Sequence, residues 1–236
     1  MEIHKLKPIH SWRDFLKELG TIVLGIIIAI SLEYLVESWH WDNEVKAARQ
    51  AIRAEIAANN ENILAFRVAL APCVDRQIAE TDRNLAAMEA GLDPPGFTSF
   101  NLPAVTLVKD GDWQAERASQ VLTHFPRAEL ALMSGYYVQL PDFRSWGTQE
   151  GAAWRQLSAL QKPSKGMTPS DLIRLRDALR AAQDAEFLIV SNAERQLRVS
   201  RQLGISDPTP DAVRIKNWCT MNPDDYRRYR RSQDLR

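Results

Sequence analysis

Two cysteines are the side chains whose chemistry says most about this chain. Cys73 and Cys219 are its only thiols, and in an oxidising compartment such a pair forms a disulfide. They stand 146 positions apart, and the chain-entropy model values the closure of so long a loop at roughly 4–5 kcal/mol. We expect this bridge, with Trp218 beside it helping to bury the tail. The alternative is two unrelated buried thiols that act as small apolar side chains.

Other groups of the kind used in enzyme sites do not occur at catalytic or metal-binding spacings. No two of the four histidines stand at the spacing of metal ligands, and two cysteines are too few for a zinc ribbon. The chain has no glycine-rich phosphate loop and no Gly-x-Ser-x-Gly nucleophile elbow. We therefore expect a protein that is not an enzyme and that holds no metal and no cofactor. The histidines are His4, His10, His40 and His124.

Charge gives one more candidate and excludes one class of partner. Glu33 follows an apolar run, and carboxylates within a membrane often handle protons, but its position at the edge of the run favours a solvated charge. Lys plus Arg and Asp plus Glu are balanced at 30 each, so no field over the whole chain would attract nucleic acid. We interpret the arginines of Tyr226–Arg231 as part of a tail and expect no nucleic-acid partner.

The elements that must position these groups begin with an apolar segment near the N-terminus. Leu19–Leu32 contains 14 residues without a charge, and as a helix it measures about 21 Å. A hydrocarbon core needs roughly 30 Å. The flanking residues supply the difference, because the 22 residues of Phe15–Val36 measure about 33 Å as a helix. The run has no polar face and no small-residue cleavage site, so we predict an uncleaved transmembrane helix over residues 19–37 in preference to a core helix or a signal peptide.

Five side chains are predicted at the two membrane surfaces. Trp12 lies on one side of the span, and Trp39 and Trp41 lie on the other, as aromatic residues do at headgroup level. Lys17 can extend toward the first surface, and Glu33 lies near the second. The lipid bilayer is therefore the first partner that we expect.

Within the span, Gly25 and Ala29 are two small residues one turn apart, a pattern that lets membrane helices approach closely. We interpret this pair as a helix-helix packing site for another subunit or for a second copy of the chain. Residues 1–18 carry four basic residues and residues 37–54 carry three, which favours a cytoplasmic N-terminus. We expect a bacterial inner-membrane protein with residues 1–18 in the cytoplasm and the rest in the periplasm.

Beyond the span the pattern is that of a helical bundle. An apolar stripe with intervals of three, four and seven residues runs from Val45 to Leu70 and includes Ile63. Asn59 lies in this stripe, and we interpret it as an end-of-face residue that touches water. Pro72 is expected to begin or kink a second helix, which Gly91 ends. Further helices are predicted over residues 112–124, 126–139, 141–160 and 168–203.

The fold class that follows is mainly α. We predict an N-terminal transmembrane helix that continues into a long amphipathic helix, packed in an extracytoplasmic helical bundle. The bundle takes residues 38–205 and includes a proline-rich loop over residues 91–111. Residues 206–236, with three prolines, form a C-terminal tail.

Three segments of the chain resemble one group of known sequences: Ser11–Glu18, Ile22–Ala29, and the pattern Val45-x-x-Ala-Arg-x-Ala-Ile-Arg-x-Glu-Ile. The likeness is less pronounced around Asp112–Ala115 and Tyr136–Tyr137. This group consists of uncharacterised bacterial single-pass inner-membrane proteins with an N-terminal signal-anchor helix and a helical periplasmic region. The resemblance implies the topology predicted above and carries over no activity and no site residue.

Three functions are compatible with these observations. We expect a membrane-anchored helical interaction or scaffold protein, an accessory subunit of an oligomer or of a larger inner-membrane complex. One alternative is a periplasmic ligand-binding or sensor module that acts through a partner. The other is a membrane-tethered enzyme with an unrecognised site, assembled from residues distant in the sequence.

Overall fold

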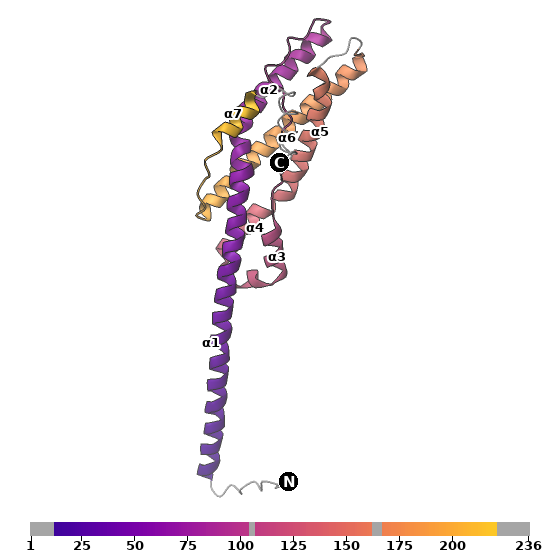
Figure 1. Cartoon of the computed structure of the whole chain (residues 1–236). Coiled ribbons are helices and arrows are strands. Elements are labelled where there is room, and N and C mark those ends of the chain that lie inside the picture. The colour runs from indigo at the N-terminus through magenta and orange to yellow at the C-terminus, as the bar shows by residue number, and fades with distance from the viewer. Residues whose placement is uncertain (1–11, 104–106, 162–166, 221–236) are drawn as a thin grey trace, which may run out of the picture.

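We describe a computed structural model of the chain, which covers residues 12–103, 107–161 and 167–220. It is mainly helical, and the described residues include no strand (Figure 1). The helices are α1 (Trp12–Asn59), the π-helix η1 (Asn60–Leu64), α2 (Ala65–Glu89), α3 (Gly111–Ala118), the 3-10 turn η2 (Val121–His124), α4 (Arg127–Tyr137), α5 (Leu140–Leu157), the 3-10 turn η3 (Ser158–Gln161), α6 (Pro169–Gln202) and α7 (Ala212–Thr220). Tyr226–Arg231, His4 and His10 lie outside the described residues.

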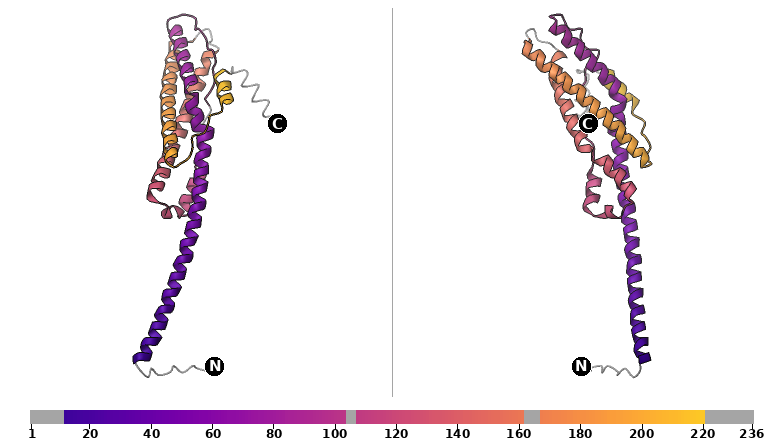
Figure 2. Two further views of the ribbon diagram at one scale, coloured as in Figure 1. Left: turned by 90° about the vertical axis from the view of Figure 1, so that its left-hand side faces the viewer. Right: turned by 180° about the vertical axis from the view of Figure 1, so that it is seen from behind.

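One helical rod organises the molecule. α1, η1 and α2 follow each other without a gap over the 78 residues of Trp12–Glu89, about 117 Å at 1.5 Å per residue. The lower part of α1 projects alone from the bundle, and α3 and α4 lie beside its upper part (Figure 1). At the far end α6 packs along α2 and α5 packs along α6, and the two further views of Figure 2 show the same arrangement.

The π-helix η1 changes which residues face the core. The sequence pattern predicts Ile63 in the buried stripe, but the structure buries Leu64 completely and leaves Ile63 half-buried. A π-turn contains an extra residue relative to an α-turn, so the face that packs inward shifts along the chain. The stripe itself, from Val45 to Leu70, is present on both sides of the shift.

The structure corrects two expectations about the rod. Of the two alternatives for Pro72, the start of a helix is wrong, since Pro72 lies inside α2, on its exposed side. Proline removes one backbone hydrogen bond of the helix, and at this position the missing bond faces solvent. The nearby Leu70 and Val74 are fully buried, so packing holds the helix together. Asn59 does not touch water either, being 1% exposed.

The second half of the chain supplies the partners of the rod. α6 begins with a capping box in which Thr168 accepts from the Asp171 amide and the Asp171 carboxylate accepts in return. α6 ends at Gln202, and Gly204, just beyond its C-cap, has a φ of 70°, a conformation that glycine adopts at little cost. The predicted helix over residues 112–124 is two elements, because Gln120 has a φ of 66° and separates α3 from η2.

The buried apolar residues form two separate cores, each named here after the part of the rod on which it is built. The α1 core packs α1 against α3, η2, α4, the start of α5 and the end of α6. The α2 core packs α2 against the end of α5 and the start of α6. The α1 core includes Ile52, Ile56, Trp113, Met133, Tyr136, Tyr137, Phe143, Ile189 and Leu197. The α2 core includes Phe66, Leu70, Val74, Phe100, Ala153, Trp154, Leu157, Leu179 and Ala182.

Amide side chains of the rod bind the segment between α2 and α3. The Gln77 amide donates to the Asn101 carbonyl at 2.9 Å and accepts from the Asn101 amide at 2.8 Å. Asn59 makes the same pair of bonds to Lys109, at 2.7 and 2.8 Å, and Asn84 makes it to Gly96, at 2.9 and 2.8 Å. These three clamps explain why polar residues occupy buried positions on the rod.

Candidate functional site

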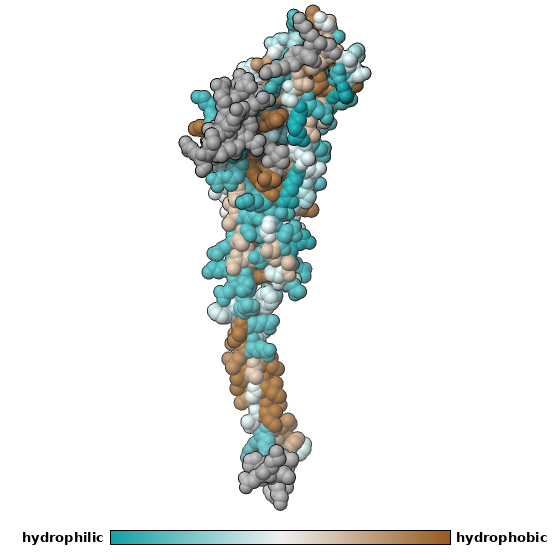
Figure 3. Space-filling model, turned by 45° about the vertical axis from the view of Figure 1, so that its right-hand side comes forward, coloured by the Kyte–Doolittle hydropathy of each residue, from teal (hydrophilic) through white to brown (hydrophobic). Residues whose placement is uncertain are grey.

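The first candidate site is the part of α1 that projects from the bundle. Over Trp12–His40 every residue is exposed except Phe15, which is half-buried, and these 29 residues measure about 44 Å. Their apolar side chains form the brown surface at the lower end of Figure 3. This helix is long and apolar enough to cross a membrane. A soluble protein rarely exposes so large an apolar surface to water.

The residues predicted at the membrane surfaces lie at the two ends of this segment. Trp12 and Trp39 are 73% and 70% exposed and free to contact lipid headgroups, and Lys17 lies 3.8 Å from Asp14. Glu33 is also exposed. Trp41 differs, because its ring stacks on His124 of η2 with 3.9 Å between centroids. The bundle therefore begins within two residues of Trp39.

Gly25 and Ala29 are exposed on the projecting helix, and a side chain added at Gly25 would meet nothing within 4 Å. Thr21 and Glu33 continue the same four-residue spacing, which forms an inclined ridge on the helix. The Thr21 hydroxyl donates to the Lys17 carbonyl at 3.0 Å, so its hydrogen bond is made within the helix. This ridge is open to a second helix.

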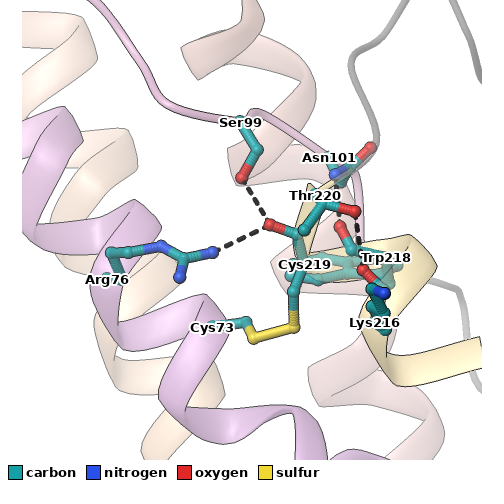
Figure 4. Close-up of a disulfide and its surroundings, with 8 residues drawn as sticks. All are labelled: Cys73, Arg76, Ser99, Asn101, Lys216, Trp218, Cys219 and Thr220. Carbon is teal, nitrogen blue, oxygen red and sulfur yellow. Dashed lines mark hydrogen bonds between the residues drawn. A yellow bond between two sulfur atoms is a disulfide. The ribbon is translucent and has the colours of Figure 1, made fainter. Parts of the chain in front are cut away.

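The second candidate site is the attachment of the C-terminal helix (Figure 4). Cys73 of α2 and Cys219 of α7 lie at disulfide distance, with 5.5 Å between their Cα atoms. Around the bridge, the last carbonyls of α7 are satisfied: Arg76 and Ser99 donate to the Cys219 carbonyl at 2.8 and 3.0 Å. Asn101 donates to the Trp218 carbonyl at 2.6 Å. The bond predicted from the two thiols is thus compatible with the structure.

Within the predicted tail, the helix α7 was not expected. It has no buried residue, and Trp218 and Ile215 pack on the α2 core while half-buried. Its other anchor is Arg214, whose guanidinium carbon lies 3.9 Å from the centre of the Phe66 ring. Arg214 also donates to the Asn62 carbonyl in η1 at 3.2 Å.

The third candidate site is a buried ion cluster that the sequence analysis missed. Arg67 of α2 donates to Glu150 of α5 at 2.7 Å and also to Glu186 of α6. All three side chains are at most 5% exposed. Burial, only partly offset by Arg67 and reinforced by the Glu150 charge, raises the pKa of Glu186 to about 8. Nothing in the sequence joins three residues that lie 83 and 119 positions apart.

A further buried carboxylate organises the α1 core. Glu55 accepts from the Asp112 amide at 2.9 Å and from the Tyr137 hydroxyl at 2.7 Å. It thereby caps the N-terminus of α3, where a negative charge is favourable. Tyr137 stacks on Trp113 with 4.8 Å between ring centroids, and burial together with its bond to Glu55 raises the pKa of Tyr137. The burial of the Glu55 carboxylate is therefore explained by the bonds with which it holds α3 and α4 to α1.

Comparison with known proteins adds no relative. No family model, no curated protein and no solved structure matches the chain. Among the residues that the structure describes, no group of three or more His, Cys, Asp or Glu is arranged to hold a metal ion. The interpretation of the three sites therefore depends on their physical chemistry.

Proposed function

We propose that the chain is a membrane-anchored helical interaction protein, an accessory subunit that associates with other membrane proteins. One observation carries the proposal: α1 leaves the bundle as a bare apolar helix, and the same helix continues into the α1 core, where Ile52 and Ile56 are fully buried. A partner that binds the membrane segment is thus joined to the bundle by continuous helix. Such a rod transmits position and orientation without a flexible linker.

The disulfide supports a location for the bundle outside the cytoplasm. Disulfides persist in oxidising compartments and are rare in cytosolic proteins, and Cys73 and Cys219 lie at bonding distance. The excess of basic residues before the span favours a cytoplasmic N-terminus. We therefore place the bundle in the periplasm of a bacterium, with the span in the inner membrane, as the resemblance to single-pass inner-membrane proteins also implies.

The ridge of Thr21, Gly25, Ala29 and Glu33 supports a partner helix within the membrane. Small residues at its centre let a second backbone approach closely. A second copy in the same orientation would bring its own Glu33 toward this Glu33, and like charges repel. A different subunit, with a basic residue at that depth, fits the ridge better than a second copy does.

The test is affinity purification of the tagged full chain from native membranes in a mild detergent, followed by native mass measurement. We expect a particle heavier than the chain alone, containing a second membrane protein. Gly25→Ile fills the open ridge and should lower the recovered partner by about tenfold, or about 1.4 kcal/mol. A strictly monomeric particle with no co-purifying protein would contradict the proposal.

Gly20→Ile is the matched control. Gly20 lies on the same helix, and a side chain added there also meets nothing within 4 Å. It stands five positions from Gly25, which turns it by about 140° around the helix. The Gly20→Ile variant should co-purify as much partner as the unmodified chain. An equal loss of partner in both variants would refute the proposal that the partner binds at the ridge.

A further inference from the structure

The ion cluster of Arg67, Glu150 and Glu186 lies where the helices pass from one core to the other. On α5, Glu150 falls between Phe143 of the α1 core and Ala153 of the α2 core. On α6, Glu186 falls between Ala182 of the α2 core and Ile189 of the α1 core. The rod changes core between Ala65 and Phe66, so Arg67 lies one residue beyond the change. The cluster is therefore a polar layer sealed between two apolar regions.

The charges of this layer do not balance when all three groups are ionised. Two carboxylates then face one guanidinium. The side chains of Arg67 and Glu150 are at most 2% exposed, and that of Glu186 is 5% exposed. The other charged group that acts on Glu186 is Asp75, also on α2, and it is negative. An uncompensated charge buried in a protein interior is costly, and such a group usually becomes neutral by binding a proton. One proton on the two carboxyl groups makes the cluster neutral.

The hydrogen bonding of the layer is also incomplete within the described part of the chain. Arg67 Nε, Arg67 Nη1 and Glu186 Oε1 are buried and have no protein partner there. A buried polar atom that nothing binds destabilises the folded state. Water satisfies both kinds of atom, since it accepts from the guanidinium nitrogens and donates to the carboxylate oxygen. A proton on Glu186 would supply a donor toward Glu150 as well.

We propose that Arg67, Glu150 and Glu186 form a proton-binding site, in which the two carboxyl groups hold one proton between them, water occupies the unpartnered positions, and loss of the proton weakens the packing of α5 and α6 on α2. The proton is taken from solvent and returned to it, and no other bond changes. The ligand class is thus a proton with structural water, held between the two cores.

The direction of the pH dependence follows from the raised pKa of Glu186. Its pKa is about 8 in the folded protein, against an ordinary value of 4.5. The folded state therefore holds the proton more tightly than the unfolded state does. The stability that this contributes is fully present below the ordinary pKa and falls as the pH rises from there to about 8. Over that interval the unfolding equilibrium constant rises by up to about tenfold per pH unit.

The experiment is chemical unfolding of the full chain in detergent from pH 5 to pH 9, followed by circular dichroism, with the disulfide intact. We expect the unmodified chain to lose stability across this range. Glu186→Gln mimics the protonated carboxyl and should remove the pH dependence. Glu150→Gln removes one of the two negative charges while Glu186 stays buried, so it should reduce the pH dependence without abolishing it. Glu194→Gln, an exposed residue on the same helix, should keep the profile of the unmodified chain.

A spectroscopic measurement distinguishes proton binding from a merely structural role and needs no variant. Infrared difference spectra of the unmodified chain between pH 6 and pH 9 should show the carbonyl band of a protonated carboxylic acid disappearing as the pH rises. Glu186→Gln, used as a control, should lack that band. Absence of the band in the unmodified chain, or an unchanged pH profile in Glu186→Gln, would overturn the proposal.

Discussion

The two cores of the bundle are stabilised in different ways, although one helical rod runs through both. In the α1 core, buried polar side chains of the rod reach other segments: Glu55 binds the start of α3, and Asn60 binds Ser200 of α6 at 2.8 Å. In the α2 core, a disulfide fastens the short helix α7 over the segment that Gln77 clamps. Both cores are therefore held by noncovalent packing, and the second carries in addition a covalent attachment that depends on redox conditions.

The strongest test of this difference is removal of the disulfide. We expect Cys73→Ser with Cys219→Ser to destabilise the bundle by about 3–5 kcal/mol, because the unfolded chain regains the freedom of a long loop. Exchange through global unfolding should rise in both cores, and exchange through local opening should rise further in α7 and in the α2 core beside it than in the α1 core. Equal loss of protection in both cores would show that they unfold as one unit and that the distinction has no energetic meaning.

The next test compares matched amide clamps, one beside each core. The backbone N–H and C=O of Asn101, a residue that is 6% exposed, are both bonded to the Gln77 side chain. Gln77→Ala removes both bonds and should lower the free energy of unfolding by about 1–3 kcal/mol. Asn59→Ala removes the same pair of bonds from the exposed Lys109. Water can reach that peptide group more easily, so this change should cost about 1 kcal/mol. Urea unfolding of both variants gives these values.

Combining the clamp variants with the disulfide variant sharpens the comparison further. Asn101 joins Gln77 to the Trp218 carbonyl of α7, so Gln77→Ala should cost less when α7 is already released. The hydrogen bonds of Asn59 reach neither α7 nor the disulfide. The loss of stability caused by Asn59→Ala should therefore be the same with and without the disulfide. Additive behaviour of Gln77→Ala would mean that α7 and the clamp act independently.

Sequence patterns predicted the elements that depend on local periodicity. The apolar run of α1, the N-cap of α6 at Thr168, and the glycines that follow α2 and α6, Gly91 and Gly204, can be predicted from spacing, capping and glycine conformation. The pairing of Cys73 with Cys219 could be predicted from chemistry alone, because they are the only two thiols of the chain. These features need no knowledge of the tertiary structure.

The features that were missed are those that tertiary contacts decide. α7 has only nine residues and follows two prolines, and an isolated helix of that length is unstable in water. The disulfide and the bonds to its last carbonyls hold it in place. Arg67 stands next to apolar Phe66 and would be assigned to the surface, because only the fold brings Glu150 and Glu186 to it.

The smallest expected effects concern two arginines that lie over phenylalanine rings, one beside each core. Arg214 covers Phe66 at 3.9 Å, and Arg49 lies 5.4 Å from the centre of the Phe125 ring. Arg49 also forms a two-pronged ion pair with Glu129, at 2.8 and 2.9 Å. Replacement of either arginine by glutamine should cost about 0.5–1 kcal/mol, because both sites are partly exposed to solvent.

The effect of salt concentration on stability distinguishes the two arginine variants. The ion pair of Arg49 is screened by dissolved ions, so the cost of Arg49→Gln should fall when the salt concentration is raised from 0.05 to about 1 M. Arg214 lies close against a ring that is only 5% exposed and donates to a backbone carbonyl, and the cost of Arg214→Gln should change less. Denaturant unfolding of the two variants at both salt concentrations measures this. A greater salt effect at Arg214 than at Arg49 would show that the attachment of α7 depends on long-range charge and not on contact with Phe66.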